Sequence, residues 1–319
     1  MRVLISAGWL GGAGGAERAL HSVLRALNQD DVDVVVRQHL DGPFAVVGPR
    51  VRVFRLMDWR WRASARTTGL KGRLIQNVLN PIRRAILPKY DVYLQFFSGG
   101  YVAPAANVGV RLLIPSGLSV SAEMAQKFDY IALQAPDNAK LAPEGARTVL
   151  LPPPLFDLSE TADRPDVDLP ERYFLTVFNP YDPVKGLDDL ARIVDEAPHP
   201  IVWCHSQRTL QWPIPESVSN HPNIVHVDDP SPAQMRYLYE RCQAYLSFSR
   251  SEGFGWSTAD ALRYSSVVVS RKIGILSYDE PLDGVVMVGE NWDVDWRMAE
   301  PTGSVARDLT WVGPERFRA

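Results

Sequence analysis

The sequence contains little cysteine and no long apolar run. Its 319 residues include two cysteines, Cys204 and Cys242, which form no CxxC motif and have no histidine cluster nearby. A zinc site and a disulfide framework are therefore not expected, and the cysteine usage is typical of a cytosolic protein. No apolar run approaches the roughly 18–20 residues that cross a membrane. The apolar stretch Val3–Ile5 is too short for a signal peptide, and we expect it to form a buried strand.

The chain as a whole also lacks a strong charge of one sign. Its formal net charge is −3, with 46% hydrophobic and 22% charged residues. These values exclude bulk disorder and do not indicate a general polyanion binder. At about 100–200 residues per domain, the length predicts two domains.

Short apolar runs alternate with segments of helical periodicity, which predicts parallel sheets with helices on both faces. A proline-rich and acidic stretch over residues 152–172 interrupts the alternation and is typical of a linker. Two doubly wound α/β domains in tandem are therefore expected, with ligands bound outside the carboxyl ends of their strands. The predicted strands cover residues 3–5, 32–36, 51–54, 91–96, 111–114, 130–133 and 148–151, then 173–177, 201–204, 224–226, 244–247 and 267–269.

A glycine-rich loop, Gly11–Glu17, lies between the first predicted strand and the first predicted helix. Peptide amides without bulky side chains can approach a ligand closely, and the helix that follows favours phosphate at its amino end. The loop lacks the lysine of a P-loop, which disfavours a P-loop nucleoside triphosphatase. A purely structural tight turn is the alternative interpretation.

Two segments of the second domain carry candidate binding groups. In Val177–Leu187, Lys185 follows a predicted strand, and its ammonium could neutralise a diphosphate. In Ser249–Leu262, Glu252 precedes a helix that contains Asp260, and these carboxylates suit the hydroxyl groups of a sugar or ribose. Considered alone, Lys185 could equally be a solvated loop lysine, and Glu252 and Asp260 could be a helix-capping acid and an exposed helical acid.

Together these motifs resemble those of retaining glycosyltransferases of the GT-B fold, in the glycosyltransferase family 4 (group 1) superfamily. The family's glycine loop is matched by Gly14–Glu17, its lysine–glycine pair by Lys185-Gly186, and its E-x7-E signature by Glu252 to Asp260. Further similar segments are Asn223–Val227, Met235–Tyr239 and Val267–Ser270 before Gly274.

The resemblance implies two Rossmann-like, doubly wound parallel-sheet domains that face a central cleft. Residues 1–160 would form the N-terminal acceptor-side domain, and residues 161–300 the C-terminal domain that binds the nucleotide-sugar. Residues 301–319 would form a tail that packs back toward the N-terminal domain.

The resemblance also implies roles for individual residues. Lys185 and Glu252 would be catalytic, with Lys185 at the donor phosphates and Glu252 at the hydroxyls of the transferred sugar. Asp260 would hold the nucleotide ribose. The implied donor-binding residues are Gly14, Gly15, Asn179, Lys185, Glu252, Gly253, Phe254, Gly255 and Asp260.

Three departures from the family pattern stand out. Pro180 occupies the position of a usual basic residue, so Arg250 or Arg208 becomes a candidate to meet one phosphate charge. Asp260 is one methylene shorter than the usual glutamate. The stretch Arg111–Ser121 lacks the acceptor-side histidine that many members carry.

The implied activity is retaining transfer of a sugar from a nucleotide diphosphate-sugar, UDP- or GDP-linked, to a carbohydrate or lipid-linked acceptor, as in polysaccharide biosynthesis. No obligatory cofactor is implied. Two alternatives stay open: a degenerate GT-B domain that binds a nucleotide-sugar or a protein partner without turnover, and a nucleotide-sugar hydrolase or epimerase. Three Asp-x-Asp strings, at residues 31–33, 166–168 and 293–295, are expected by chance, and we expect no metal site.

Residues 50–89 form a basic segment with eleven arginines and lysines and a single acid, Asp58. Leu70, Leu74, Val78, Ile82 and Ile86 follow a helical spacing within it. One interpretation is a core helix with a solvated basic face. The other is docking to an anionic membrane surface, at the inner face of the membrane for a cytoplasmic protein, or to a phosphate-bearing acceptor. No recognition motif accompanies these residues, so nucleic acid is not expected.

Overall fold

The computed structural model describes residues 1–11, 14–42, 44–55, 78, 80–96, 107–180, 183–206, 214–301, 307–314 and 317. It divides into two compact units, Met1–Leu155 with Val312–Ala319, and Phe156–Trp311. Each unit is built around one sheet, and every strand pair in these two sheets is parallel. The prediction of two parallel-sheet α/β domains is confirmed.

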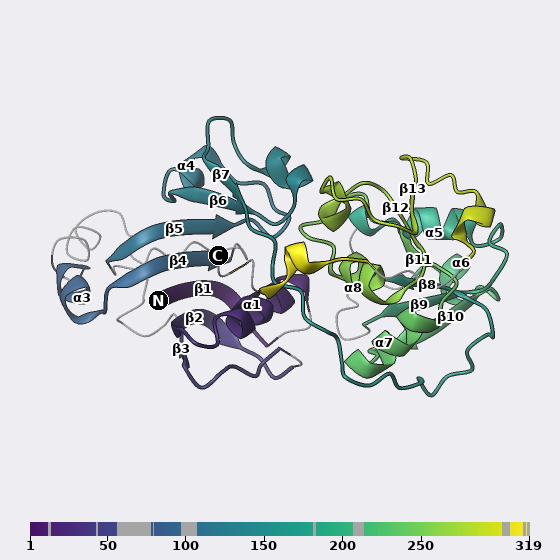
Figure 1. Ribbon diagram of the computed structural model, residues 1–319, viewed down its shortest axis with the longest axis horizontal. Helices are drawn as coiled ribbons and strands as arrows, with labels where there is room; N and C mark the ends of the chain where they lie inside the picture. Colours follow the sequence, from purple (N-terminus) through teal and green to yellow (C-terminus); the bar gives the residue numbers. More distant parts are fainter. Residues whose placement is uncertain are drawn as a thin grey trace. The chain divides into compact units, whose positions relative to one another are not determined.

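The sheet of the first unit has seven strands in the order β3-β2-β1-β4-β5-β6-β7 (Figure 1). Its strands are β1 (Arg2–Leu10), β2 (Asp31–His39), β3 (Val51–Arg55), β4 (Tyr90–Phe96), β5 (Val108–Ile114), β6 (Tyr130–Leu133) and β7 (Thr148–Leu150). Its helices are α1 (Gly15–Ala26), α3 (Asn80–Ile86) and α4 (Ala122–Ala125), with a 3-10 turn at Pro136–Leu141.

The central strands of this sheet are buried on both faces, which explains their nearly continuous apolar runs. Val3, Leu4 and Ile5 in β1 are each at most 1% exposed. Helix α1 covers one side of the sheet with Leu20, Val23 and other apolar residues at helical spacing.

One carboxylate interrupts the apolar pattern of β2. Asp33 is 2% exposed and lies directly opposite Arg52 of β3 in the strand register. Arg52 donates two hydrogen bonds to it, at 2.7 and 2.8 Å, and the Tyr90 hydroxyl donates a third at 2.5 Å. The buried charge is therefore paired and hydrogen-bonded, as a carboxylate in a core requires.

The sheet of the second unit has six strands in the order β10-β9-β8-β11-β12-β13. Its strands are β8 (Phe174–Val177), β9 (Ile201–His205), β10 (Ile224–Asp228), β11 (Tyr245–Ser247), β12 (Val268–Ser270) and β13 (Val285–Met287). Its helices are α5 (Leu187–Ile193), α6 (Glu216–Ser219), α7 (Pro232–Arg241) and α8 (Trp256–Tyr264). The 3-10 turns are Pro183–Lys185, Gly274–Ser277 and Trp296–Ala299, with Thr310–Val312 at the end of the unit.

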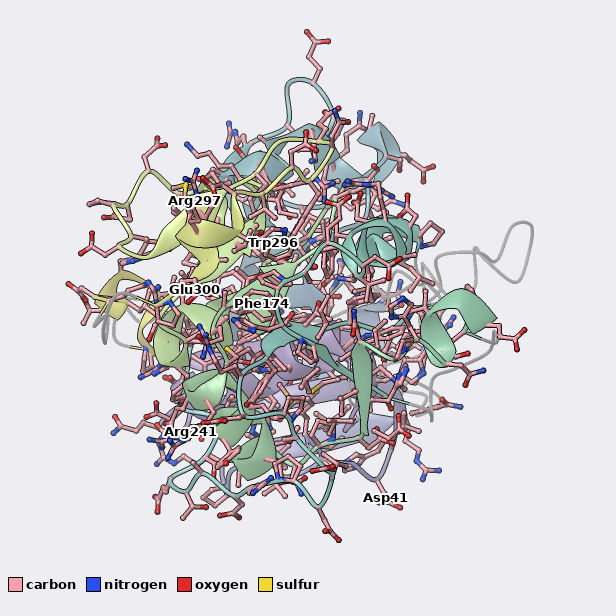
Figure 2. All side chains as sticks on the ribbon, turned by 90° about the vertical axis from the view of Figure 1, so that its right-hand side faces the viewer. Asp41, Phe174, Arg241, Trp296, Arg297 and Glu300 are labelled. Atoms are coloured by element: carbon pink, nitrogen blue, oxygen red, sulfur yellow. The ribbon has the colours of Figure 1, made fainter. Side chains whose placement is uncertain are left out.

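Aromatic side chains fill the core of the second unit. Trp203 is fully buried and donates its indole N–H to the Phe178 carbonyl at 2.9 Å. Trp296 stacks on Phe174 with ring centroids 5.1 Å apart, and Figure 2 shows these two side chains next to each other. Trp292 is also fully buried and donates to the carbonyl of Ser247 at 3.0 Å. The indole rings of Trp292 and Trp296 thus pack the segment after β13 against the sheet.

Most of the basic segment lies outside the described residues. Of the stretch with helical spacing from Leu70 to Ile86, the structure describes Val78 and the residues of α3. The predicted linker, residues 152–172, contains no helix or strand. Among the described residues, no helix combines the length and apolarity needed to cross a membrane.

Candidate functional site

The candidate site lies where the strand order of the second sheet reverses. From β8 the chain builds the sheet outward through β9 and β10, and it then returns to place β11 on the other side of β8. Ligands of open parallel sheets bind at the carboxyl ends of the strands that flank such a reversal. Lys185 follows β8 and Glu252 follows β11, so both predicted catalytic residues stand at this point.

Lys185 and Glu252 form an ion pair at the site. The Lys185 Nζ atom lies 2.7 Å from Glu252 Oε1, and the two side chains are 27% and 15% exposed. The structure therefore brings together two residues that are 67 positions apart in the sequence. Both charges remain partly accessible to solvent, so a ligand could exchange for either partner.

Gly186 allows the loop after β8 to approach the loop after β11. It has a φ of +72°, and a Cβ there would collide with the carbonyl oxygen of Phe248. Beside it, the Arg250 amide donates to the Val184 carbonyl at 2.7 Å. A glycine directly after Lys185 is therefore a steric requirement of the site.

The loop after β12 packs against the same place. The Ile275 amide donates to the Phe254 carbonyl at 2.7 Å, and a Cβ on Gly274 would lie 2.6 Å from that oxygen. Phe254 is 2% exposed, so its side chain is held in the core beneath the loop. Gly255, with a φ of +83°, forms the N-cap of α8 and carries no side chain over the helix end. Gly253 lies in the same loop, and the amide groups there are suited to an anion.

Sequence reasoning missed the buried carboxylate that ties these loops together. Asp189, 6% exposed, accepts hydrogen bonds from Arg250 at 3.0 Å and from Arg271 at 2.8 Å. Arg271 also donates to the Phe248 carbonyl at 2.7 Å. Arg250 further bonds Asp188 at 2.7 Å, so its charge is already paired with two carboxylates. Arg208, the other candidate for the phosphate charge, lies outside the described residues.

Two further predicted donor-binding residues of the second unit have structural contacts. The Asn179 side-chain oxygen accepts a hydrogen bond from the Ser206 amide at 2.9 Å, which links the ends of β8 and β9. Asp260 lies on α8 and is 3% exposed.

Gly14 and Gly15 belong to the first unit, where they stand at the start of α1. Strand β1 borders the reversal of strand order in its own sheet, between β1 and β4. Gly14 is the N-cap of α1 and has no side-chain hydrogen bond there. Residues 12 and 13 of the predicted glycine loop lie outside the described part of the chain.

A histidine pair, also missed from the sequence, lies at the ends of β9 and β10. His205 Nε2 is 3.0 Å from His226 Nδ1, and His205 Nδ1 is 3.1 Å from Asp228 Oδ1, although the latter contact is not aligned as a hydrogen bond. Burial lowers the pKa of His205, and His226 adds to this lowering while Asp228 opposes it. Polar residues at the ends of adjacent predicted strands were the available signal.

Within the described ranges, no three His, Cys, Asp or Glu side chains are grouped as metal ligands would be. The search of family models and the search of curated proteins found no match to this chain.

Solved structures do match. Sucrose-phosphate synthase from Thermosynechococcus elongatus aligns with a TM-score of 0.62 and 14% identity, over 90% of this chain and 85% of that one. Anabaena HepE in complex with UDP and glucose aligns with a TM-score of 0.61 and 14% identity, over 94% and 89%. The lipopolysaccharide glycosyltransferase WaaG aligns with a TM-score of 0.57 and 12% identity, over 86% and 83%.

The chain has the GT-B fold. Identities of this size establish the fold, and the activity has to be argued from the site.

Replacing Gly186 with alanine tests the steric requirement at the site. We expect Gly186→Ala to lower the free energy of unfolding by roughly 1–3 kcal/mol, because a left-handed backbone and a clash with Phe248 are combined. Chemical denaturation measures this loss. Gly289→Ala is the matched control, since nothing lies within 4 Å of its added Cβ. Equal stability of the two variants would contradict the assignment.

The buried histidine predicts a pH dependence of stability. Because the folded-state pKa of His205 is lowered, the unfolded chain binds more protons once the pH drops below about 6.5. The free energy of unfolding should therefore decrease as the pH falls through this region, and His205→Gln should flatten the decrease. Denaturation curves at several pH values measure it. An unaltered slope in His205→Gln would refute the prediction.

Proposed function

We propose that this protein is a retaining glycosyltransferase that moves a sugar from a nucleotide diphosphate-sugar to a carbohydrate or lipid-linked acceptor. The observation that carries the proposal is the Lys185–Glu252 pair at the strand-order reversal of the second sheet. Its support is threefold: the GT-B fold, a cation and a carboxylate in contact at the expected sheet edge, and beside them a helix whose N-cap residue, Gly255, has no side chain.

Lys185 supplies the positive charge that the leaving group needs. When the sugar–phosphate bond breaks, negative charge grows on the diphosphate, and a positioned ammonium stabilises it more in the transition state than in the ground state. The amide groups of Gly253, Phe254 and Gly255, at the amino end of α8, add to this stabilisation. Asn179 binds the donor from the end of β8.

Glu252 has a different task. Its carboxylate accepts hydrogen bonds from hydroxyls of the transferred sugar, and the donor's own phosphate helps to remove the acceptor proton on the same face. In the structure Glu252 pairs with Lys185, so donor binding must exchange this ion pair for contacts to the sugar and the phosphates. The pair keeps both charges satisfied until the donor arrives.

The proposal also assigns donor contacts to Asp260 and, separately, to two glycines of the first unit. Asp260 holds the ribose hydroxyls, and its shorter side chain accommodates a direct or water-bridged contact. Gly14 and Gly15 let the start of α1 approach the donor phosphates. UDP or GDP is the proposed nucleotide, and no obligatory cofactor is proposed. Support for UDP comes from HepE, whose structures hold UDP with glucose and UDP-glucose.

Alanine substitutions at the ion pair test the proposal. Lys185→Ala and Glu252→Ala should each reduce turnover by roughly 10²-fold or more, the scale of losing one preorganised charge contact. Product analysis with UDP- and GDP-sugars and a panel of acceptors provides the rate and identifies a new glycoside.

Lys127→Ala is the control, because it breaks another lysine–glutamate pair of similar length, 2.9 Å, between Glu123 of α4 and Lys127, which lies two residues after that helix ends. Its turnover should equal that of the unmodified protein. Free sugar as the product would indicate a hydrolase, and an epimer would indicate an epimerase, in place of a transferase. Nucleotide-sugar binding with no product would point to a degenerate domain, and undiminished turnover in either alanine variant would refute the assigned roles.

We also propose that the basic segment docks the enzyme on an anionic membrane surface, at the inner face of the membrane. The described part of this segment offers apolar side chains beside cations: Val78, Ile82 and Ile86 are 45%, 46% and 52% exposed, and Arg84 is exposed as well. Such a pairing of apolar and basic groups suits an interface with acidic lipids.

Liposome co-sedimentation tests the docking. The protein should bind vesicles that contain acidic phospholipid at low salt, and Ile82→Glu should reduce the bound fraction several-fold because it removes apolar contact and adds repulsion. Val149→Glu, at an equally accessible residue of β7, is the control. Absence of binding to acidic vesicles would remove the proposed membrane role without touching the proposed transfer.

A further inference from the structure

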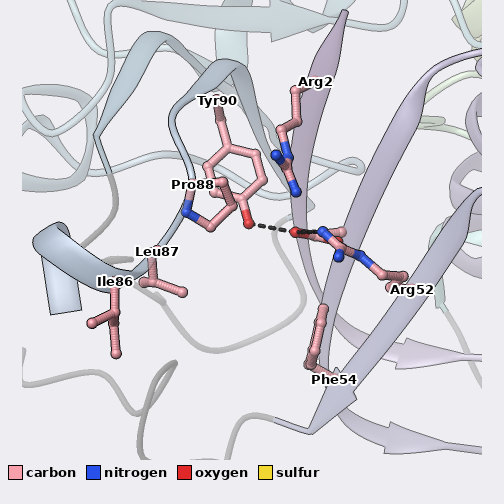
Figure 3. Close-up of a pocket in the computed structure, with 8 residues that line it drawn as sticks. Arg2, Arg52, Phe54, Ile86, Leu87, Pro88 and Tyr90 are labelled. Carbon is pink, nitrogen blue, oxygen red and sulfur yellow. Dashed lines mark hydrogen bonds and ion pairs between the residues drawn. The ribbon is translucent and has the colours of Figure 1, made fainter.

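A pocket lies at the amino ends of the strands of the first sheet, whereas the glycine loop follows the carboxyl end of β1. It has a volume of about 380 Å³ and is lined by Arg2, Asp33, Arg52, Phe54, Ile86, Leu87, Pro88 and Tyr90 (Figure 3). Arg2 begins β1 and Tyr90 begins β4, so the pocket opens at the amino ends of the strands. Strand β1 spans nine residues, which separates the pocket from the glycine loop by roughly 26 Å.

The polar half of this pocket has an excess of positive charge. The carboxylate of Asp33 is already satisfied by Arg52 and by the Tyr90 hydroxyl. Arg2 is the second cation of the lining, and its guanidinium approaches the Tyr90 ring, 5.7 Å from the centroid. Figure 3 shows the Arg2 and Arg52 side chains extending toward each other across the pocket.

Arg2 has unused hydrogen-bonding capacity. Its Nε atom is buried and has no hydrogen-bond partner in the structure as described. A buried donor without a partner is costly, and a charged donor more so. The Arg2 backbone amide, in contrast, donates to Asp91 at 2.7 Å, which fixes the start of the strand and hence the side chain's origin. An oxygen-rich anion in the pocket would accept hydrogen bonds from the guanidinium of Arg2 and balance its charge.

The other half of the pocket is apolar. Phe54 and Leu87 belong to or pack against the core cluster below, while Pro88 and Ile86 form the wall toward the surface. Ile86 is 52% exposed, so the apolar wall continues to the mouth of the pocket. A ligand that fits both halves carries an oxyanion at one end and an apolar group at the other.

We propose that this pocket is a second binding site, separate from the proposed donor site, for an organic oxyanion attached to an apolar group. Arg2 binds the oxyanion through its guanidinium, with Arg52 contributing its remaining N–H groups. Phe54, Ile86 and Pro88 contact the apolar group. A lipid headgroup and a small phosphate ester share this chemistry.

Isothermal titration of the full chain tests the site with defined probes. Hexyl phosphate and dihexanoyl phosphatidic acid, below its micelle concentration, should bind with 1:1 stoichiometry, while inorganic phosphate and hexanol should bind at least tenfold more weakly. Tighter binding of the phosphatidic acid identifies a lipid headgroup as the source, and tighter binding of hexyl phosphate a small ester.

Variants locate the binding. Arg2→Gln should weaken the binding of the preferred probe at least tenfold, whereas Arg147→Gln, the same charge change at an exposed residue outside the lining and outside the basic segment, should not. Ile86→Glu, which adds a repulsive charge at the exposed mouth of the pocket, should also weaken binding, whereas Val149→Glu, at an exposed residue of β7 outside the lining, should not. No binding of either amphiphilic probe at millimolar concentration would overturn the proposal. Equal weakening by Arg147→Gln and Arg2→Gln would do the same, because it would indicate non-specific attraction to surface cations.

Discussion

The buried carboxylate of Asp189 holds the loops of the second unit in register. It accepts from Arg250, in the loop after β11, and from Arg271, at the end of β12, while its own helix follows the Lys185 turn. Three loops that leave three neighbouring strands are thereby fixed at one sheet edge. The Lys185–Glu252 contact depends on this arrangement, because each of its partners sits on one of the tied loops.

Two glycines, Gly186 and Gly274, also help to fix these loops, because they have no side chain where the loops meet. A side chain at Gly186 would push the Lys185 turn away from Phe248, and one at Gly274 would press on the Phe254 carbonyl. The hydrogen bonds to Asp189 and the missing side chains at Gly186 and Gly274 act on the same loops. Both therefore help to fix the position of the Lys185–Glu252 ion pair. A preorganised charge of this kind is what stabilisation of a leaving diphosphate requires.

The sequence predicts the architecture well because parallel strands buried on both faces leave continuous apolar runs, such as Ile201–Cys204. It also predicts which ends of those strands carry Lys185 and Glu252. It could not predict the partners of single charged residues: Asp189 and Arg271 are 82 positions apart, and their contact depends on how loops pack. The same holds for Asp33, whose place inside an apolar strand is understood only once Arg52 and Tyr90 are found beside it.

The central claim is that the second unit binds a nucleoside diphosphate through Lys185. Thermal unfolding in the presence of nucleotides tests this claim most directly. Thermal unfolding would be followed with UDP, GDP, ADP, dTDP and CMP, for the unmodified protein and for Lys185→Ala. A ligand at 100 times its dissociation constant stabilises the folded state by about 2.7 kcal/mol. We expect one nucleoside diphosphate to raise the unfolding temperature of the unmodified protein, and we expect this rise to be lost in Lys185→Ala. No shift with any nucleotide, or an undiminished shift in Lys185→Ala, would contradict it.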